Sequence, residues 1–275
     1  MARAAALLLF LAACAPQYSV DGRPYALAIP ADVKGPLPLV VLLHGFGASA
    51  EAQDVILPFS KEVASRRFLY ALPNGTIDSD GKRFWNATDA CCDYEDLKPD
   101  DVTFVRKVIA DVKANHRVDA RKVFLIGHSN GGFLALRLAC EAGDEVTAVV
   151  SLAGATWLDA QRCPPGRPVS VLAVHGTADT VIGFNGGSTN AGAYPSASRT
   201  VATLAERNGC TGARAKLGSS DFLDDAASET TREAFSGCPA GGAVELWSVA
   251  GAGHIPIFHP QWRTAVLDWL DAAAR

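Results

Sequence analysis

Ser129 lies in a pattern that makes a serine side chain reactive, because Gly127-His128-Ser129-Asn130-Gly131 places a glycine two residues away on each side. An apolar, β-branched run precedes it at 123–126, and a helical pattern follows it at 131–142. A strand, a sharp turn and a helix are the context in which this G-x-S-x-G spacing exposes a nucleophilic serine at the carboxyl edge of a sheet. The glycines allow the helix and the strand to approach closely around a strained turn. We therefore predict that Ser129 is a nucleophile for acyl transfer.

A serine hydroxyl attacks an acyl group efficiently only when a histidine takes its proton and a carboxylate orients that histidine. In this arrangement the acid, and then the histidine, follow the serine along the chain. The apolar run 169–174 leads to His175-Gly176-Thr177-Ala178-Asp179, and the run 244–249 leads to a short glycine-rich segment that ends at His254. We predict Asp179 as the acid and His254 as the base, both just beyond strand ends.

Other residues compete for these two roles. The rival acids are Asp159, Asp221, Asp224 and Asp225. Only Asp159 follows soon after an apolar strand run. The rival base is His259, which stands beside Pro260 at a helix start, where a capping or surface role is simpler. For His44 and His175, each before a glycine at a strand end, we expect hydrogen bonds to loop backbone rather than catalysis.

Acyl transfer also needs two hydrogen-bond donors for the oxyanion that develops on the acyl group. The backbone N–H of Asn130, directly after the nucleophile, is the first candidate. The loop after the run 39–43 supplies the second, for which we predict the backbone N–H of Phe46. The helix after Ser129 adds the positive end of its dipole. The predicted reaction needs neither a metal nor an organic cofactor.

Short apolar runs alternate with helical patterns along the chain. The runs are rich in β-branched residues, as expected for strands buried on both faces, and lie at 38–43, 68–72, 123–126, 146–150 and 169–174. The helical patterns lie at 100–115, 131–142, 198–208 and 260–274. This alternation predicts one α/β domain with a mostly parallel sheet and helices on both faces. Residues 18–29 are expected to form an edge hairpin around Asp21-Gly22, and the polar stretch 209–242 an excursion with a small hairpin.

Charge and length exclude several classes of protein. The chain has 275 residues, and its net charge of −4 gives too weak a field to favour nucleic acid or an anionic membrane surface as a partner. No apolar run in the sequence reaches the roughly 20 residues that span a bilayer, and no fixed-period repeat occurs in it. We expect a monomer whose partner is an ester substrate, with one catalytic domain over residues 18–275.

The first residues resemble an export signal. Arg3 is followed by an apolar stretch up to Ala13, and Leu11-Ala12-Ala13-Cys14 resembles the bacterial lipobox, in which cleavage leaves a lipid-carrying cysteine at the new N-terminus. We predict that residues 1–13 are a signal peptide and that Cys14 is lipidated, which places the protein in the cell envelope or outside the cell. An ordinary signal cut near Ala13 to Ala15 and a buried helix are the alternatives.

Six cysteines remain beyond Cys14, and an even number in an exported chain favours disulfides. They are Cys91, Cys92, Cys140, Cys163, Cys210 and Cys238. No two of them have the C-x-x-C spacing of a zinc site. The sequence does not select a pairing; we favour Cys210 with Cys238, and the adjacent pair Cys91 and Cys92 with Cys140 and Cys163. Buried free thiols are the alternative.

Several motifs together resemble the α/β-hydrolase fold and, within it, the secreted polyhydroxybutyrate depolymerase and feruloyl esterase family, close to the carbohydrate esterases that deacylate xylan. The motifs are His44-Gly45, Pro73-Asn74-Gly75, Trp85-Asn86-Ala87 with Cys91-Cys92, Asp100-Asp101-Val102, Gly127-His128-Ser129-Asn130-Gly131-Gly132, Arg137-Leu138-Ala139-Cys140, His175-Gly176-Thr177-Ala178-Asp179, Asn208-Gly209-Cys210 and Gly251-Ala252-Gly253-His254. The resemblance implies Ser129, Asp179 and His254 as a catalytic triad. It also implies Phe46 and Asn130 as the oxyanion donors.

The chain departs from that family's pattern beside the triad. His128 precedes Ser129 and Phe133 follows Gly132, in a segment where methionine is common, and Ile255 stands where the family often has tryptophan. These departures leave the triad intact and bear on the choice of substrate. The sequence shows no separate polymer-binding domain, which favours soluble or amorphous esters over crystalline polymer.

Aromatic residues near the predicted site are candidates for substrate contacts. We expect Phe46 and Trp157 to flank a flat acyl group, where ring stacking adds about 0.5–1.5 kcal/mol beyond burial. Trp85 and the loop 183–190 are expected to line the cleft. The alternative for Trp157 is a ring that packs beneath a loop.

These observations favour an exported serine carboxylic ester hydrolase. Its expected substrates are feruloyl or acetyl esters of plant polysaccharide, or short aliphatic or aromatic polyesters. Depolymerisation of a polyhydroxyalkanoate or of an aromatic polyester is the alternative within the same class. A serine peptidase and a non-catalytic substrate-binding lipoprotein are alternatives of other classes.

Overall fold

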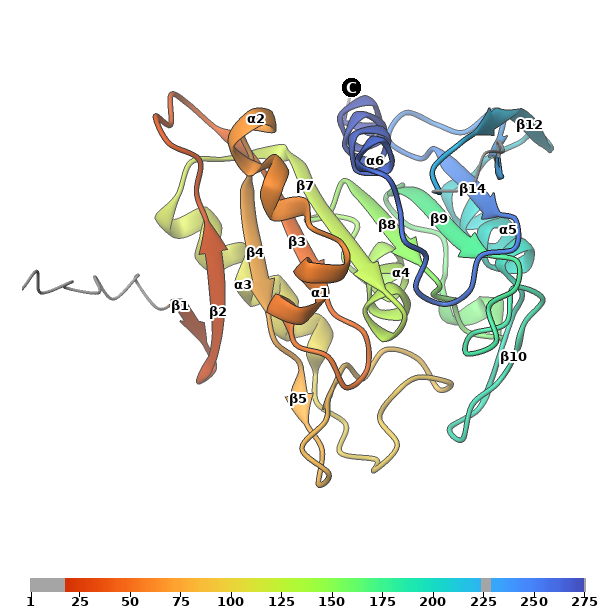
Figure 1. Ribbon diagram of the computed structural model, residues 1–275, viewed down its shortest axis with the longest axis horizontal. Helices are drawn as coiled ribbons and strands as arrows, with labels where there is room; N and C mark the ends of the chain where they lie inside the picture. The colour runs from red at the N-terminus through yellow and green to blue at the C-terminus, as the bar shows by residue number, and fades with distance from the viewer. Residues whose placement is uncertain (1–17, 224–228, 275) are drawn as a thin grey trace, which may run out of the picture.

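The central sheet of the computed structural model extends across the molecule and carries helices on both faces (Figure 1). The structure describes residues 18–223 and 229–274. Over these residues the sheet has ten strands. In spatial order the strands are β1 (Tyr18–Val20), β2 (Arg23–Ala28), β4 (Leu69–Pro73), β3 (Leu37–Leu43), β7 (Val118–His128), β8 (Ala148–Leu152), β9 (Ser170–Gly176), β14 (Val244–Val249), β13 (Thr230–Phe235) and β12 (Arg214–Ser220).

The middle of the sheet is parallel and its two sides are antiparallel. The strands β4, β3, β7, β8, β9 and β14 pair in parallel. The hairpin of β1 and β2 joins β4, and the hairpin of β12 and β13 joins β14, through antiparallel pairs. Strands β8 and β9 are buried along their whole length, as expected for parallel strands covered on both faces. The prediction of a mostly parallel sheet in one α/β domain is confirmed.

Successive side chains of β3 enter two different cores, because side chains alternate between the faces of a strand. Leu39 and Val41 pack into the core that includes α3 (Asp101–Asn115), α4 (Asn130–Glu141) and α5 (Ala197–Asn208). Val40 and Leu42 pack into the core that includes α1 (Ala50–Ile56), α2 (Val63–Arg66) and α6 (Pro260–Ala273). The sheet therefore separates two layers of helices.

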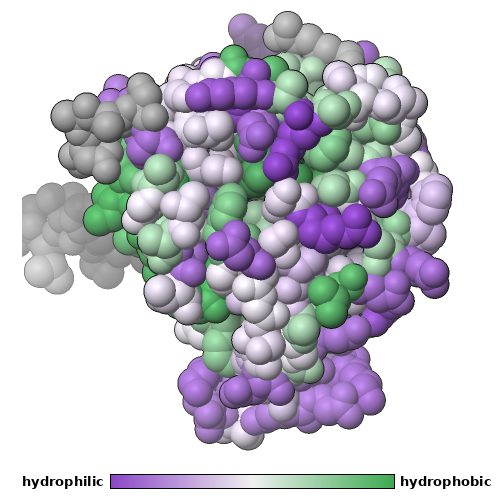
Figure 2. Space-filling model, turned by 90° about the vertical axis from the view of Figure 1, so that its right-hand side faces the viewer, coloured by the Kyte–Doolittle hydropathy of each residue, from purple (hydrophilic) through white to green (hydrophobic). Residues whose placement is uncertain are grey.

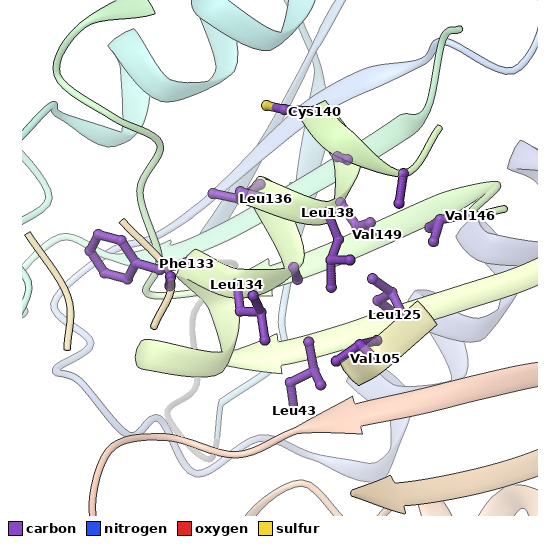
Figure 3. Packing of buried hydrophobic residues seen from close by; sticks show 14 of the residues in the cluster. Leu43, Val105, Leu125, Phe133, Leu134, Leu136, Leu138, Cys140, Val146 and Val149 are labelled. Carbon is purple, nitrogen blue, oxygen red and sulfur yellow. The ribbon is translucent and has the colours of Figure 1, made fainter. Parts of the chain in front are cut away.

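Helix α4 is held firmly against the sheet. Figure 3 shows Leu134 and Leu138 projecting from α4 toward the sheet residues Leu43 and Leu125. Side chains are buried along most of this helix, and such interiors are as densely packed as molecular crystals. The first turn of α4, which begins at Asn130, is therefore fixed by the core.

The loops between the main strands contain short hairpins and 3-10 turns. They are the short hairpins β5 (Thr76–Ile77) with β6 (Arg83–Phe84) and β10 (Gly187–Ser188) with β11 (Ala193–Tyr194), and the 3-10 turns η1 (Phe59–Glu62) and η2 (Ala160–Arg162). Both hairpins lie at the lower end of Figure 1, beyond the main sheet. Helix α3 begins within one residue of the predicted range 100–115, and the side chain of Asp100 caps it by accepting a hydrogen bond from the N–H of Thr103 (3.0 Å).

One predicted disulfide is confirmed and the remaining pairing is wrong. Cys210 bonds Cys238 at the base of the hairpin of β12 and β13. Cys91 and Cys92, however, bond each other, and Cys140 bonds Cys163. The reason is the length of α4. Cys91 lies beside Asn130 in the first turn of this helix, whereas Cys140 comes ten residues after Asn130, about 15 Å along the helix axis. This separation is too large for a disulfide between Cys91 and Cys140.

The predicted signal peptide and Cys14 lie outside the described residues. Within residues 18–223 and 229–274, no helix is both long and apolar enough to cross a membrane.

Candidate active site

Ser129 occupies a sharp turn between β7 and α4. Its backbone has φ 53° and ψ −121°, a conformation that residues with a side chain rarely adopt. The N–H of Ser129 donates to the carbonyl of Leu152 (2.8 Å), which ties the turn to β8. A Cβ atom at Gly127 would lie 2.1 Å from the carbonyl oxygen of Gly131, and a Cβ at Gly131 would lie 2.1 Å from that of Leu43. Both positions therefore require glycine.

Asp179 and His254 meet at the ends of the neighbouring parallel strands β9 and β14. Nδ1 of His254 lies 2.8 Å from Oδ2 of Asp179, so Nδ1 carries a proton and Nε2 is the nitrogen left to accept one. Oδ1 of Asp179 accepts the backbone N–H groups of Val181 (2.8 Å) and Ile182 (2.9 Å). The structure thus brings the predicted acid and the predicted base together.

The carboxylate of Asp179 is held in its charged form. Burial raises its pKa, but hydrogen bonds from His175, His254 and the backbone of Ile182 lower that pKa well below the ordinary value of an aspartate. Nε2 of His175 also donates to the carbonyl oxygen of Ile182 (2.8 Å), which confirms the predicted backbone role of this histidine. A charged carboxylate at this place stabilises a protonated His254.

His128 links the serine turn to the two loops around it. Its Nε2 donates to the carbonyl oxygen of His254 (2.9 Å), and the two rings lie 5.0 Å apart between centroids. Its Nδ1 lies 3.3 Å from Oε1 of Gln53, which also accepts the N–H of Gly45 (3.0 Å). The residue before the predicted nucleophile therefore contacts the loop of the predicted base and, through Gln53, the loop of Phe46. Sequence reasoning missed this role, because His128 fills a variable position of the motif.

The backbone N–H groups of Phe46 and Asn130 are available for an oxyanion. Asn130 is the first residue of α4, where N–H groups have no partner within the helix. Beside Phe46, the N–H of Gly45 donates to Gln53 and the N–H of Gly47 donates to the carbonyl of Arg83 (2.8 Å). Among the described residues, neither the N–H of Phe46 nor that of Asn130 has an acceptor. This arrangement is what the predicted oxyanion donors need.

Trp85 is a buried residue beneath the site, so the expectation that it contacts substrate is wrong. Its side chain is fully buried (0% exposed), and its Nε1 donates to the carbonyl of His44 (2.9 Å). The Asn130 side chain accepts from the Trp85 N–H (2.7 Å) and donates to its carbonyl (2.9 Å). Trp85 therefore joins the segment before Phe46 to the first residue of α4.

The ring of Trp157 is also buried, at 4% exposed. The guanidinium carbons of Arg137 and Arg162 lie 5.9 and 5.1 Å from its ring centroid. This environment matches the alternative in which Trp157 packs beneath a loop. The exposed ring beside the Phe46 loop is instead Tyr94, 45% exposed, whose centroid lies 5.3 Å from that of Phe46 in an edge-on contact. An aromatic residue in a polar loop was the only sign of it in the sequence.

The rival residues have other surroundings. Asp159 accepts the N–H of Gln161 (2.9 Å) at the start of η2, and Asp221 is exposed. Asp224 and Asp225 lie outside the described residues. His259 stands at the start of α6, as expected. Within the part of the chain that the structure describes, no three histidine, cysteine or carboxylate side chains are grouped to hold a metal ion.

We expect the free energy of unfolding to fall as the pH drops from about 7 to about 4, because His44 and His128 are buried in their neutral forms. Burial lowers the pKa of each to about 4, from 6.5 for the free side chain. Below pH 6.5 the unfolded chain binds protons that the folded chain does not, which destabilises the fold by about 3 kcal/mol per histidine at pH 4. Denaturant unfolding across this pH range measures the slope.

His128→Gln should reduce that slope by up to one proton, since glutamine does not titrate. His116→Gln is the control, because His116 is only half-buried and its replacement leaves both buried histidines in place. An unchanged slope in the His128 variant would contradict the assignment.

Comparison with known proteins agrees with the fold. The sequence profile of the phospholipase/carboxylesterase family matches residues 27–204. Among solved structures, an acetyl xylan esterase from Aspergillus awamori superposes with a TM-score of 0.63 at 12% identity, over 90% of this chain and 93% of that one. A Bacillus cereus carboxylesterase superposes with a TM-score of 0.57 at 16% identity, over 91% and 94% of the two chains.

Several curated relatives are feruloyl esterases. Feruloyl esterase B of Piromyces equi is 25% identical over 79% of this chain and 39% of its own length. Feruloyl esterase D of Neurospora crassa is 26% identical over 85% of this chain and 74% of its own. The chain spans about half the length of the first curated relatives it matches. The predicted resemblance to esterases of the α/β-hydrolase fold is confirmed, and the chain belongs to the phospholipase/carboxylesterase family.

Proposed function

We propose that this protein is a serine carboxylic ester hydrolase with Ser129 as nucleophile, His254 as base and Asp179 as the orienting acid. The contact of 2.8 Å between Nδ1 of His254 and Oδ2 of Asp179 carries the proposal. That contact fixes the tautomer a general base needs. The strained turn of Ser129, whose neighbour His128 touches His254, supports the third role.

The mechanism is two-step acyl transfer. Nε2 of His254 takes the proton of Ser129 Oγ as the oxygen attacks the ester carbonyl, and Asp179 stabilises the resulting imidazolium. The N–H groups of Phe46 and Asn130 hold the oxyanion. His254 then gives its proton to the leaving alcohol, and water attacks the acyl-enzyme by the same steps to release the acid.

The proposed substrates are feruloyl and acetyl esters. The names of the matching relatives support this class, since they include feruloyl esterases and an acetylxylan esterase joined to a xylanase. A second candidate is a short aliphatic or aromatic polyester. It is favoured by two exposed apolar side chains next to the triad, Val181 (60%) two residues after Asp179 and Ile255 (53%) directly after His254, because an apolar chain would cover them.

We also propose that the protein is exported as a monomer, with Cys14 as a lipid anchor. The three disulfides support export, since such bonds persist in oxidising compartments.

A fluorophosphonate probe tests the enzyme class directly. We expect one probe per chain, on the peptide that contains Ser129, because the oxyanion donors and His254 activate that hydroxyl alone. The labelled and unlabelled proteins are then compared on p-nitrophenyl acetate, methyl ferulate, amorphous polyhydroxybutyrate and a p-nitroanilide. Ester turnover that labelling abolishes supports the proposal. A folded protein that takes no label would point to a binding protein, and faster amide than ester turnover would point to a peptidase.

A further inference from the structure

A polar cavity of about 480 Å³ lies apart from the triad, between the loop 86–98, the tip of the loop 190–191 and the side of α4. We call it the loop cavity. Three hydrogen bonds hold its walls together. Thr189 Oγ1 donates to the carbonyl of Ala90, and Arg137 Nη1 donates to the carbonyls of Asn86 (3.1 Å) and Ala87 (3.2 Å). The cavity is therefore bounded by several segments that contact one another.

The loop cavity begins beside the predicted oxyanion loop. Tyr94 lines it and packs edge-on against Phe46. At its other side, Arg137 of α4 lies eight residues beyond Ser129, which corresponds to about 12 Å along the helix axis. A ligand that fills this cavity would therefore extend away from the nucleophile along the side of α4.

The charges around the loop cavity cancel. Three cationic and three anionic side chains line it: Lys98, Arg137, Arg162, Asp89, Asp93 and Asp96. Arg162 pairs with Asp89 (2.6 Å) and Lys98 pairs with Asp96 (3.0 Å). Neither an anionic nor a cationic ligand gains from such a balance. A neutral ligand loses nothing through this balance, and it can gain from hydrogen bonds to the polar lining side chains.

Donors, acceptors and a ring face are all present. The side chain of Asn190 has no hydrogen bond among the described residues, and its amide can both donate and accept. The half-exposed ring of Tyr94 offers an apolar surface for C–H groups. The loop tips at this end of the molecule are hydrophilic in Figure 2. Hydroxyl groups on a C–H framework, as in a sugar chain, match this combination.

We propose that the loop cavity binds a neutral oligosaccharide, as a distal subsite for the glycan whose ester is cleaved at Ser129. This inference rests on the proposed ester hydrolase activity. It identifies the alcohol part of the ester substrate as a sugar chain. It assigns the glycan chain, rather than the acyl group, to the loops 86–98 and 190–191.

Calorimetry on the Ser129→Ala protein measures binding without turnover, with xylotetraose as the probe. Ala191→Trp fills the loop cavity from an exposed position that lines it. Ala193→Trp is the matched control, since Ala193 is exposed on the same hairpin, at the start of β11, but does not line the cavity. We expect xylotetraose to bind, with at least about tenfold weaker affinity in the Ala191 variant, or about 1.4 kcal/mol, and unchanged affinity in the Ala193 variant.

Turnover by protein that retains Ser129 supplies the second readout. For Ala191→Trp we expect kcat/KM on acetylated xylo-oligosaccharides to fall about tenfold through KM, while p-nitrophenyl acetate, which has no sugar, is hydrolysed at the native rate. Absence of xylotetraose binding, equal losses on both substrates, or equally tight binding of the anionic tetragalacturonate would each overturn the proposal. Failure of the native protein to hydrolyse any ester would instead remove the proposed function, while calorimetry would still decide what the cavity binds.

Discussion

Ser129→Ala should lower kcat on p-nitrophenyl acetate by about 10⁶-fold, because the acyl-enzyme can no longer form. The remaining rate should still exceed that of water, since the N–H groups of Phe46 and Asn130 can bind an oxyanion without the serine. The fold should be unaffected, as the Ser129 side chain does not cap α4. Initial rates together with thermal unfolding of both proteins measure the two effects.

Ser151→Ala is the matched control for this change. Ser151 lies on β8, the neighbour of the strand that ends at the serine turn, and its Oγ is buried without a hydrogen-bond partner among the described residues. Its loss should leave kcat within about twofold of the native value. Equal activity in the Ser129→Ala and native proteins would rule out the proposed nucleophile.

Asp179→Asn should lower kcat/KM by about 10⁴-fold, by analogy with the triad acid of serine proteases. Asparagine can keep the acceptor contacts to Val181 and Ile182 through Oδ1. Its Nδ2 would then face Nδ1 of His254, which must become the acceptor. The proton moves to Nε2, and His254 can no longer act as a base toward Ser129. Steady-state kinetics at neutral pH test this expectation.

Asp159→Asn is the comparison for the acid, because Asp159 was the rival that follows a core strand and it accepts only a local hydrogen bond at η2. We expect near-native kcat/KM from it. A lower kcat/KM for Asp159→Asn than for Asp179→Asn would assign the acid role to Asp159 and contradict the assignment of Asp179.

The positions of the predicted triad could be found from sequence because each residue follows a buried parallel strand. Such strands read as continuous apolar runs, and their carboxyl ends meet at one edge of the sheet. The runs before Ser129, Asp179 and His254 became β7, β9 and β14, with β8 between the first two. The contact between Asp179 and His254 is favoured by the adjacency of β9 and β14, and the right-handed crossover rule restricts the possible strand orders.

Features that depend on how loops cross one another could not be found in this way. Helix α1 could not be predicted because its polar and apolar residues do not follow the usual pattern of burial. Gln53 is buried, and Val55 is 81% exposed. Gln53 is inside because its Oε1 accepts from Gly45, a tertiary contact that no local pattern encodes. The roles of Trp85 and of Cys91 with Cys92 share this cause, since both lie where a loop packs on the first turn of α4.

The hairpin of β12 and β13 also bears on self-association, because β12 forms one edge of the central sheet. Strand β12 ends the order of the central sheet, and the edge of a sheet is a template on which a further strand can add. The pairing of β12 shifts register between Lys216 and Gly218, and such a bulge bends and twists a strand so that a straight neighbour no longer fits. Lys216 adds an exposed positive charge to the same strand, whereas Arg214 pairs with Glu233 of β13 (3.6 Å). The outer edge of β12 is thus a poor template for the addition of a strand from a second copy of the chain.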